Sequence, residues 1–248
     1  MGSELLQQTL YDRIFDEYEQ HYDDACSQSY RNRFIYGPLF GGLRLQSADV
    51  LEAMCGSGQT TQYLLDHGAH VTGLDISAAA MQSFGHRFPQ CRGICTSILE
   101  SALPDRSFDY VVVVGGLHHV HPQVSAAVAE IHRLLRSGGY FLFVEPHAGS
   151  LPDVIRRFWY RRDRLFAANE AAIDLGALRS AFRNQFEFSR DRYQGNLAYL
   201  LVLNSLVLRI PVRWKRYYTP GLLWLEGLLE RLQTPRLSCF AACAWRKR

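Results

Sequence analysis

Short apolar runs alternate with longer amphipathic segments between residues 49 and 145. The runs are rich in Val, Leu and Ile and have the length of strands, whereas apolar residues in the intervening segments recur at three- and four-residue steps, which is typical of helices. Strands that alternate with helices predict a parallel sheet covered on both faces. The expected strands are 49–53, 70–74, 92–96, 110–114 and 140–144, and the expected helices are 60–67, 78–88 and 122–135.

The pattern changes beyond residue 147. A helix at 175–183 and a strand at 186–193 continue the alternation, and the apolar run 237–245 suits a seventh strand that is antiparallel to the others. Residues 195–235, where the sheet pattern is interrupted, predict a helical insertion that includes a helix at 221–232.

Two helices are expected before the first strand, at 4–24 and 30–43, and a further helix at 151–165. We therefore expect a single α/β domain. Its parts are an N-terminal helical cap at 1–46, a core at 47–194 and 236–248, and the insertion at 195–235 within the full length 1–248.

A glycine-rich loop joins the first expected strand to the first expected helix. Gly56 and Gly58 allow backbone N–H groups to approach a ligand, and the helix start adds the positive end of a dipole. A strand, loop and helix of this kind form the usual cradle for a nucleotide or nucleoside. The dinucleotide fingerprint needs Gly or Ala where this chain has Thr61, so a nicotinamide cofactor is disfavoured. Two acids stand nearby instead, Glu52 in the first strand and Asp75 at the end of the second.

Five ordered motifs resemble those of the class I S-adenosylmethionine-dependent methyltransferases. They are the segments 50–61, 70–75, 103–111, 117–120 and 134–140. The resemblance implies S-adenosylmethionine as the cofactor and a Rossmann-like, seven-stranded, mostly parallel sheet with helices on both faces, an N-terminal helical cap and a helical insertion before the last strand. The implied activity is O- or N-methylation of a small-molecule acceptor, such as a lipid, a glycan or a secondary metabolite.

The resemblance also implies particular cofactor contacts. Asp75 is expected to accept hydrogen bonds from both ribose hydroxyls, and its alternative role is to cap the following helix. Glu52 is expected to orient the methionine ammonium or the glycine loop, and its alternative role is to cap the loop amides. Met54 stands where the family commonly has glycine, a departure that affects the shape of the loop. The full expected set is Tyr22, Glu52, Cys55, Gly56, Ser57, Gly58, Asp75, Ile76, Ser97, Ile98 and Gly115.

Adenine recognition is expected from the third strand onward. Ser97 stands where the family often has an aspartate for the adenine amino group, although the backbone N–H of Ile98 could act instead through adenine N1. Ile76 would lie against one face of the ring. In this family N-terminal helices often cover the pocket, so tyrosines of the cap could reach a ligand or merely pack on the sheet. These are Tyr11, Tyr18, Tyr22 and Tyr30, with Tyr22 preferred as a pocket residue.

Histidines follow the fourth and fifth expected strands. Imidazole titrates near neutrality, so His118 or His119 could remove a proton from a hydroxyl acceptor during methyl transfer. The alternative is that both close the motif structurally. His147 is a further candidate base.

Composition adds few constraints. Apolar residues make up 48% and charged residues 21% of the chain, ordinary values for a folded protein. The chain shows neither a signal-peptide pattern nor a run of about 18 apolar residues, which favours a cytoplasmic location. The six cysteines lack a CxxC pair, so free thiols are expected, and the four-residue steps of Cys91/Cys95 and Cys239/Cys243 do not favour zinc. No metal site is predicted.

The net charge of +3 divides into −4 for residues 1–50, −3 for 51–150 and +10 for 151–248. A basic C-terminal third favours an anionic or amphipathic acceptor, a membrane surface or nucleic acid, and a solvated basic face is the alternative. Segment 197–218 places apolar residues beside four cations, which suggests peripheral membrane contact. The helix at 151–165 interleaves arginines with aromatic residues, a pattern that also fits a lipid interface or an anionic group.

Nucleic acid is the least favoured partner, because the basic excess is scattered over several elements and no RNA-binding module is recognisable. Two other classes of function stay open at this stage. One is a non-catalytic protein that retains the cofactor-binding fold, and the other is a nicotinamide-dependent oxidoreductase, which Thr61 disfavours. The sequence predicts no oligomeric state.

Overall fold

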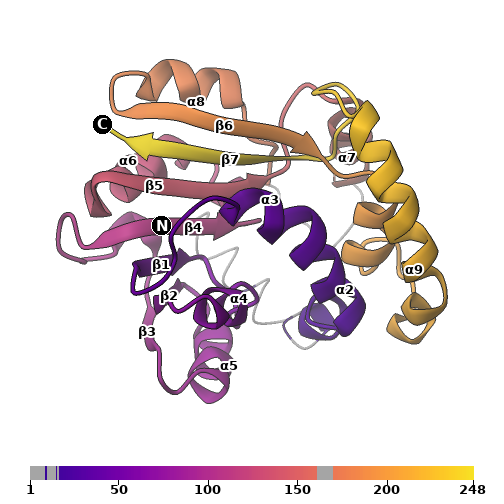
Figure 1. The fold of residues 1–248 in the computed structure, drawn as a ribbon, viewed down its shortest axis with the longest axis horizontal. Helices are drawn as coiled ribbons and strands as arrows, with labels where there is room; N and C mark the ends of the chain where they lie inside the picture. The colour runs from indigo at the N-terminus through magenta and orange to yellow at the C-terminus, as the bar shows by residue number, and fades with distance from the viewer. Residues whose placement is uncertain (1–8, 10–14, 16, 161–169) are drawn as a thin grey trace.

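The computed structural model describes residues 9, 15, 17–160 and 170–248. A seven-stranded sheet runs through its centre in the order β3-β2-β1-β4-β5-β7-β6 (Figure 1). Strand β7 pairs antiparallel with β5 and β6, and the other pairs are parallel. The predicted mostly parallel sheet with an antiparallel last strand is confirmed. The strands are β1 (Asp49–Ala53), β2 (His70–Asp75), β3 (Arg92–Cys95), β4 (Phe108–Val114), β5 (Leu135–Glu145), β6 (Phe186–Gln194) and β7 (Phe240–Lys247).

Helices cover both faces of this sheet, as the resemblance implied. The predicted helix 4–24 and the end of the predicted helix 151–165 lie partly outside the described residues, and residues 17–22 are helical. The helical elements are α2 (Ala25–Tyr30), η1 (Arg31–Tyr36), α3 (Gly37–Phe40), α4 (Thr61–Asp66), α5 (Ala78–Arg87), η2 (Ile98–Glu100), η3 (Leu117–His119), α6 (Val124–Leu134), α7 (Leu151–Tyr160), α8 (Leu175–Phe182), η4 (Tyr199–Leu203), α9 (Val212–Leu229) and η5 (Glu230–Leu232).

Alternate side chains of each central strand enter two separate cores. In β4, Val111 and Val113 pack with residues of α6 and α8, whereas Tyr110 and Val112 pack with residues of η1, α3, α4 and η4. This is the period-two geometry of a strand. Because both faces are covered, the strands read in the sequence as continuous apolar runs rather than as alternating ones. Each buried aliphatic side chain stabilises the fold by about 1.5–3 kcal/mol.

The main helix of the insertion begins earlier than the sequence predicted. Helix α9 starts at Val212 and contains Pro220 in its interior, whereas the predicted helix starts at residue 221. An interior proline removes one backbone hydrogen bond and normally interrupts a helix. Here Lys215 and Thr219, in the turns before the proline, are buried, and this inward packing offsets the lost bond. The start at residue 221 is therefore wrong.

Segment 197–218 is also less of a free surface than its composition indicated. Lys215 is 0% exposed, and its ammonium donates hydrogen bonds to Asp24 Oδ2 at 2.5 Å and to Ser27 Oγ at 2.9 Å. Val202 and Leu203 of η4 belong to one of the two cores. One of the four cations and part of the apolar run are thus internal, and only the remainder can meet a partner.

The carboxyl ends of β1 to β5 lie along one edge of the sheet, since these strands are parallel. Helices α2 and α9 and the start of α7 gather at this edge, on the right of Figure 1. In open α/β sheets, ligands bind at this edge.

All six cysteines are free. No helix among the described residues has both the length and the apolar character needed to cross a membrane.

Candidate active site

The two loop glycines serve different purposes. Gly56 and Gly58 have φ of +54° and +89°, in the left-handed region that favours glycine. A Cβ at Gly56 would meet no atom within 4 Å, and Gly56 lines a cavity of about 120 Å³. A Cβ at Gly58 would lie 2.6 Å from the ring of Phe88 and 2.9 Å from that of Phe84. Gly56 therefore opens the loop to a ligand, whereas Gly58 lets α5 pack against it and does not line the cavity.

Met54 keeps the loop shape that a glycine would give. Its φ of +55° is left-handed, which is uncommon for a residue with a side chain. Its side chain packs against one of the cores and against Gly116, where a Cβ would come within 2.7 Å of the Met54 sulfur. Left-handed backbone costs about 1–2 kcal/mol outside glycine. The departure from glycine is thus accommodated by strain and packing rather than by a different loop.

Glu52 fixes the end of the glycine loop through hydrogen bonds. Its carboxylate accepts the backbone N–H of Thr60 at 3.1 Å and the hydroxyl of Thr61. The side chain is buried, and burial raises its pKa to about 7 against these hydrogen bonds. This geometry corresponds to the loop-capping role, while the position of Glu52 in the wall of the smaller cavity leaves the charge available to a cationic ligand.

Asp75 joins the second strand to the loop after the first. Its Oδ2 accepts the N–H of Gly56 at 2.8 Å, and its Oδ1 accepts the N–H of Ser77 at 2.9 Å. The N-cap of α5 is Ser77, whose hydroxyl accepts the N–H of Ala80, so the capping alternative for Asp75 is wrong. The carboxylate of Asp75 also lines the smaller cavity, where it can accept hydrogen bonds from a ligand's hydroxyls.

The smaller cavity collects most of the predicted cofactor residues. Ser97 is the N-cap of η2 and accepts the N–H of Leu99 at 3.0 Å, which fixes it at the end of β3. Gly115 has φ of +72°, and a Cβ there would meet nothing within 4 Å. The predicted residues in the wall are Glu52, Cys55, Gly56, Ser57, Asp75, Ile76, Ser97, Ile98 and Gly115. The open backbone at Gly56 and Gly115 and the Asp75 carboxylate in the wall fit a nucleoside.

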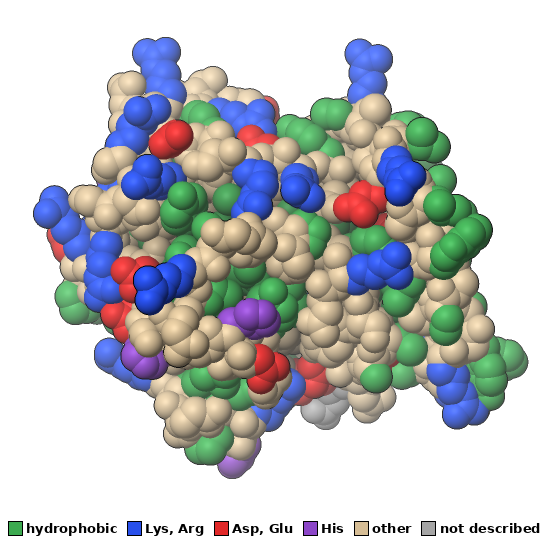
Figure 2. Space-filling view, in the orientation of Figure 1, with side chains coloured by type: hydrophobic (Ala, Val, Ile, Leu, Met, Phe, Trp, Pro, Cys, Tyr) green, Lys and Arg blue, Asp and Glu red, His purple; other side chains and the backbone are tan. Residues whose placement is uncertain are grey.

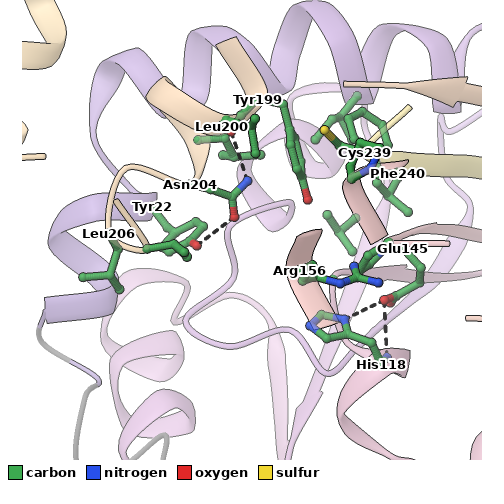
Figure 3. A pocket seen from close by; sticks show the side chains of 18 of the residues that line it. Tyr22, His118, Glu145, Arg156, Tyr199, Leu200, Asn204, Leu206, Cys239 and Phe240 are labelled. Carbon is green, nitrogen blue, oxygen red and sulfur yellow. Dashed lines mark hydrogen bonds and ion pairs between the residues drawn. The ribbon is translucent and has the colours of Figure 1, made fainter. Parts of the chain in front are cut away.

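A larger cavity of about 370 Å³ lies beside the smaller one (Figure 3). Figure 3 shows His118, Glu145 and Arg156 on one side of it and Tyr22 and Asn204 on the other. Tyr22 donates its hydroxyl to Asn204 Oδ1 at 3.0 Å. The structure therefore places Tyr22 in this second cavity and not in the wall of the first. Most of the remaining lining is apolar: Ile35, Val144, Ile155, Trp159, Leu200, Leu203, Leu206, Val207, Leu208 and Phe240.

The two cavities share part of their walls. Tyr18, Gln59, Val114, Gly115 and His119 line both of them. A group at the end of one ligand would therefore meet the other ligand beside these five residues. Of the other tyrosines expected near a ligand, Tyr30 is buried in a core and Tyr11 lies outside the described residues.

His118 is held by Glu145 at the end of β5. Its Nδ1 lies 2.7 Å from Glu145 Oε2, and the same carboxylate accepts the backbone N–H of Gly116 and of Leu117 at 2.7 Å. With Nδ1 donating to a carboxylate, the Nε2 of the neutral ring is free to accept a proton. Burial lowers the pKa of His118, and the neighbouring His119 acts in the same direction against the pull of Glu145.

His119 has a carboxylate partner of its own. Its Nδ1 lies 3.4 Å from Glu170 Oε1, and its ring centroid is 3.8 Å from that of His118. Burial alone would lower the pKa of His119, but Glu170 outweighs it and raises the pKa. His118, His119 and Glu170 offer ligand atoms within 4.8 Å of one another, so they could hold a metal ion. Pairing of each imidazole with a carboxylate also accounts for this arrangement without an ion.

His147 does not reach either cavity. Its Nε2 lies 2.7 Å from Ser238 Oγ, and its ring meets that of Tyr193 edge to face. Its prediction as a base is wrong, because the chain turns after β5 and directs the side chain toward the start of β7. Sequence reasoning also missed Glu145, Glu170 and Arg31, whereas Arg156 belongs to the arginines of 151–165 that the sequence suggested for an anionic group. Only Glu145 carried a signal, since an acid at the end of a buried strand needs partners.

Comparisons with known proteins agree with this geometry. A family profile described as a methyltransferase domain matches residues 51–143. The malonyl-[acyl-carrier protein] O-methyltransferase of Salmonella typhimurium is 31% identical over 179 residues, which are 69% of this chain and 67% of the relative. An uncharacterized methyltransferase of Synechocystis is 34% identical over 102 residues, which are 41% of this chain and 48% of the relative.

The likeness in fold extends further than the likeness in sequence. Magnesium protoporphyrin IX methyltransferase from Synechocystis, solved with bound S-adenosylmethionine, superposes over 100% of this chain and 98% of its own with a TM-score of 0.65 at 12% identity. The sheet order and the open glycine loop beside the smaller cavity define a Rossmann-like nucleoside-binding fold. The chain belongs to the class I S-adenosylmethionine-dependent methyltransferases, and S-adenosylmethionine is its cofactor. It spans about half the length of several curated relatives, between 44% and 55%.

Proposed function

We propose that this protein transfers a methyl group from S-adenosylmethionine to a hydroxyl or amino group of an amphipathic small molecule. The observation that carries the proposal is the shared wall of the two cavities, formed by Tyr18, Gln59, Val114, Gly115 and His119. A donor in the smaller cavity and an acceptor in the larger one would meet there. Correct placement of two reactants can supply up to about 7–11 kcal/mol of a barrier.

S-Adenosylmethionine, when bound, supplies a methyl group on a positively charged sulfonium, so the protein needs mainly to hold and orient. Asp75 would accept the ribose hydroxyls from its place in the wall of the smaller cavity. Ser97 and Ile98, at the end of β3, would contact the adenine. Glu52 would attract the methionine ammonium while it continues to hold the loop.

His118 is the base that the geometry favours. Its Nδ1 proton is directed to Glu145, which leaves Nε2 as the acceptor, and its lowered pKa keeps the ring neutral at physiological pH. The acceptor's O–H or N–H proton would pass to Nε2 as the new bond to the methyl carbon forms and the carbon–sulfur bond breaks. Glu145 would then stabilise the imidazolium, as a carboxylate does beside other catalytic histidines.

The larger cavity indicates the class of acceptor. Its lining is mostly apolar, and the polar members include Arg31, Asn204 and Arg156 besides the two histidines and their carboxylate partners. Such a site suits a molecule with an apolar body and one polar or anionic group, which favours a lipid or an apolar secondary metabolite over a glycan. Phthiotriol/phenolphthiotriol dimycocerosates methyltransferase of Mycobacterium tuberculosis, a relative 34% identical over 105 residues, is named for a lipid acceptor of this kind.

The test is to follow a labelled methyl group from S-adenosylmethionine into lipid and aqueous fractions of a cell extract. We expect label in the lipid fraction, formed with release of S-adenosylhomocysteine, and loss of this label with His118→Ala. Calorimetric binding of S-adenosylmethionine without any transfer into either fraction would favour the non-catalytic alternative. Transfer confined to water-soluble products would contradict the amphipathic acceptor.

A further inference from the structure

Exposed apolar side chains are confined to one part of the molecule. Among the described residues, all thirteen large hydrophobic side chains that are exposed belong to α7 or to segment 197–237. They are Leu151, Val154, Ile155, Phe158, Trp159, Leu197, Leu200, Trp214, Tyr217, Trp224, Leu228, Leu232 and Leu237. The start of α7 adjoins the end of this segment, because Leu151 N–H donates to Arg236 O at 2.8 Å. We call these two elements together the α7/α9 face.

Helix α7 presents its apolar side outward. Leu151, Val154, Ile155 and Phe158, at three- and four-residue steps, are 58–65% exposed, whereas Asp153 is 2% exposed and pairs with two arginines of the helix. A surface helix of a globular protein normally has the opposite arrangement. Solvent contact with this stripe is unfavourable by about 25 cal/mol for each Å². The stripe therefore fits a surface that meets another apolar phase.

Helix α9 adds a second stripe. Trp214, Tyr217, Trp224 and Leu228 are 45–68% exposed, and together with Gly221 they recur at alternating three- and four-residue steps along one side of the helix. The buried residues Lys215, Thr219 and Glu226 occupy the opposite side. In Figure 2, hydrophobic side chains and cations alternate over the region of α9 at the right of the view. Trp and Tyr beside arginine are typical of helices that lie in a membrane interface.

The charge of the α7/α9 face is of one sign. Its exposed charged residues are Arg157, Arg209, Arg213, Arg216, Arg231 and Arg236. The acids within the described part of these elements are turned inward or only partly exposed: Asp153, Glu226 and Glu230. Arg156 lines the larger cavity instead. A face with exposed cations and without exposed acids complements an anionic surface.

The larger cavity opens onto this face. Ile155, Trp159 and Leu200 each line the cavity and are also 58%, 38% and 41% exposed, so they form its rim. Leu197, 44% exposed, lies on the same segment as Leu200. An acceptor with an apolar body could pass from an adjoining apolar phase into the cavity without crossing water.

We propose that the α7/α9 face docks on an anionic lipid membrane and that the acceptor enters the larger cavity from the bilayer. The docking itself rests on the exposed residues, whereas entry of the acceptor rests on the proposed methyl transfer. A membrane fits better than a protein partner because the apolar residues are spread over two helices with interspersed arginines rather than gathered in one groove. This assignment extends the predicted contact 197–218 to α7 and to residue 237, and it leaves out the internal part of that segment.

The experiment is flotation of the full chain with vesicles of phosphatidylcholine and phosphatidylglycerol in equal amounts, compared with phosphatidylcholine alone. We expect binding to the anionic vesicles only, weakened by salt. The pair Trp214→Ser with Trp224→Ser should weaken it tenfold or more. The pair Arg213→Gln with Arg216→Gln should weaken it roughly thirtyfold, from about 1 kcal/mol for each arginine. The matched pair Arg92→Gln with Arg183→Gln, exposed on β3 and at the end of α8, should leave binding unchanged.

Three results would overturn the proposal. The first is absence of binding to anionic vesicles by a preparation that binds S-adenosylmethionine in calorimetry, which leaves the proposed function intact. The second is a dimer in analytical ultracentrifugation that the tryptophan pair converts to a monomer without any vesicle binding. The third is binding to an acidic acyl carrier protein that is lost in the same variants while vesicles are ignored. Vesicle binding without methyl transfer would instead uphold docking and contradict the enzymatic proposal.

Discussion

Asp24 and Lys215, which are 191 residues apart in the chain, form an ion pair with 2.5 Å between carboxylate Oδ2 and ammonium Nζ. The Lys215 side chain is 0% exposed. Asp24 is also the N-cap of α2, where it accepts the N–H groups of Cys26 and Ser27. One carboxylate therefore orients the N-terminal helices and attaches the first turn of α9 to them.

Asp24→Ala should destabilise the protein by about 3–5 kcal/mol, because it leaves a buried ammonium without its counter-ion. Urea unfolding monitored by circular dichroism measures this change. Adding Lys215→Met to the same variant removes the uncompensated charge and should restore most of the loss. If the double variant is as unstable as the single one, the helix cap rather than the ion pair is the main contribution.

Acid should weaken the same pair. Burial alone would raise the pKa of Asp24, but hydrogen bonds from Lys215 and Ser27 outweigh it and lower the pKa below its ordinary 3.8. A carboxyl whose folded-state pKa is depressed stabilises the fold above its unfolded pKa and loses that contribution as pH falls through the folded value. Unfolding free energies below pH 3.8 should therefore decrease less for Asp24→Asn than for the unmodified chain.

Asp75→Ala should weaken binding of S-adenosylmethionine tenfold or more, since each hydrogen bond to a carboxylate contributes about 1.5–3 kcal/mol. Isothermal calorimetry measures the affinity directly. Asp66→Ala is the matched control, because Asp66 is an exposed acid at the end of α4. Unchanged affinity in Asp75→Ala would contradict the ribose assignment and leave Asp75 as a support for the Gly56 loop.

Affinity for S-adenosylmethionine should rise with pH near neutrality. The pKa of Glu52 is raised to about 7 by burial, so its carboxylate gains charge through this range and attracts the methionine ammonium more strongly. Binding should therefore be weaker at about pH 6 than at about pH 7, a range in which the ligand's α-amino group keeps its proton. Glu52→Gln should abolish the dependence. A pH profile that is identical in the two proteins would show that another group is responsible.

The pH profile of methyl transfer should depend on the protonation of His118. Because burial lowers the pKa of His118 below 6.5, the rate should fall only below pH 6.5, where the base becomes protonated. His118→Ala should reduce turnover by about a hundredfold to ten-thousandfold. Glu145→Gln should move the acid limb to lower pH, a change that a purely structural role would not produce. Loss of activity with a chelator would instead indicate a metal at His118, His119 and Glu170.

The two glycines Gly58 and Gly85 offer a comparison within one small region. Gly58→Ala should destabilise by more than about 1 kcal/mol, because its φ of +89° is left-handed and the new Cβ would lie 2.6 Å from Phe88. Gly85 lies in the middle of α5 with open space around it. Gly85→Ala should therefore raise the free energy of unfolding by about 0.5–1 kcal/mol. Thermal unfolding distinguishes the two. Equal effects would mean that the loop around Gly58 can relax.

Local periodicity was sufficient for the sheet, because strands such as β1 are buried on both faces and their apolar runs are unambiguous. The expected cofactor residues, Asp75 and Ser97 among them, came from the resemblance to a family, and most of them line the smaller cavity. The second cavity could not be predicted in this way. Arg31 and Arg156 come from helices far apart in the chain, and only tertiary packing brings them to His118.

Misassignments arose where burial outweighed local propensity. Pro220 is a helix breaker by itself, but buried neighbours on both sides keep α9 continuous. Lys215 resembles a surface cation until Asp24 is found beside it. Tyr22 was expected near the cofactor and lies in the neighbouring cavity, because its hydroxyl is fixed by Asn204 from the insertion.

The partition between the two cavities has a kinetic consequence. Gly115 and His119 line both compartments, so the two ligands of the proposed reaction would meet there. We therefore expect product release to be a joint event, in which a bulky methylated molecule and the spent nucleoside would hinder each other's departure. Inhibition by S-adenosylhomocysteine would accordingly be stronger with larger acceptors.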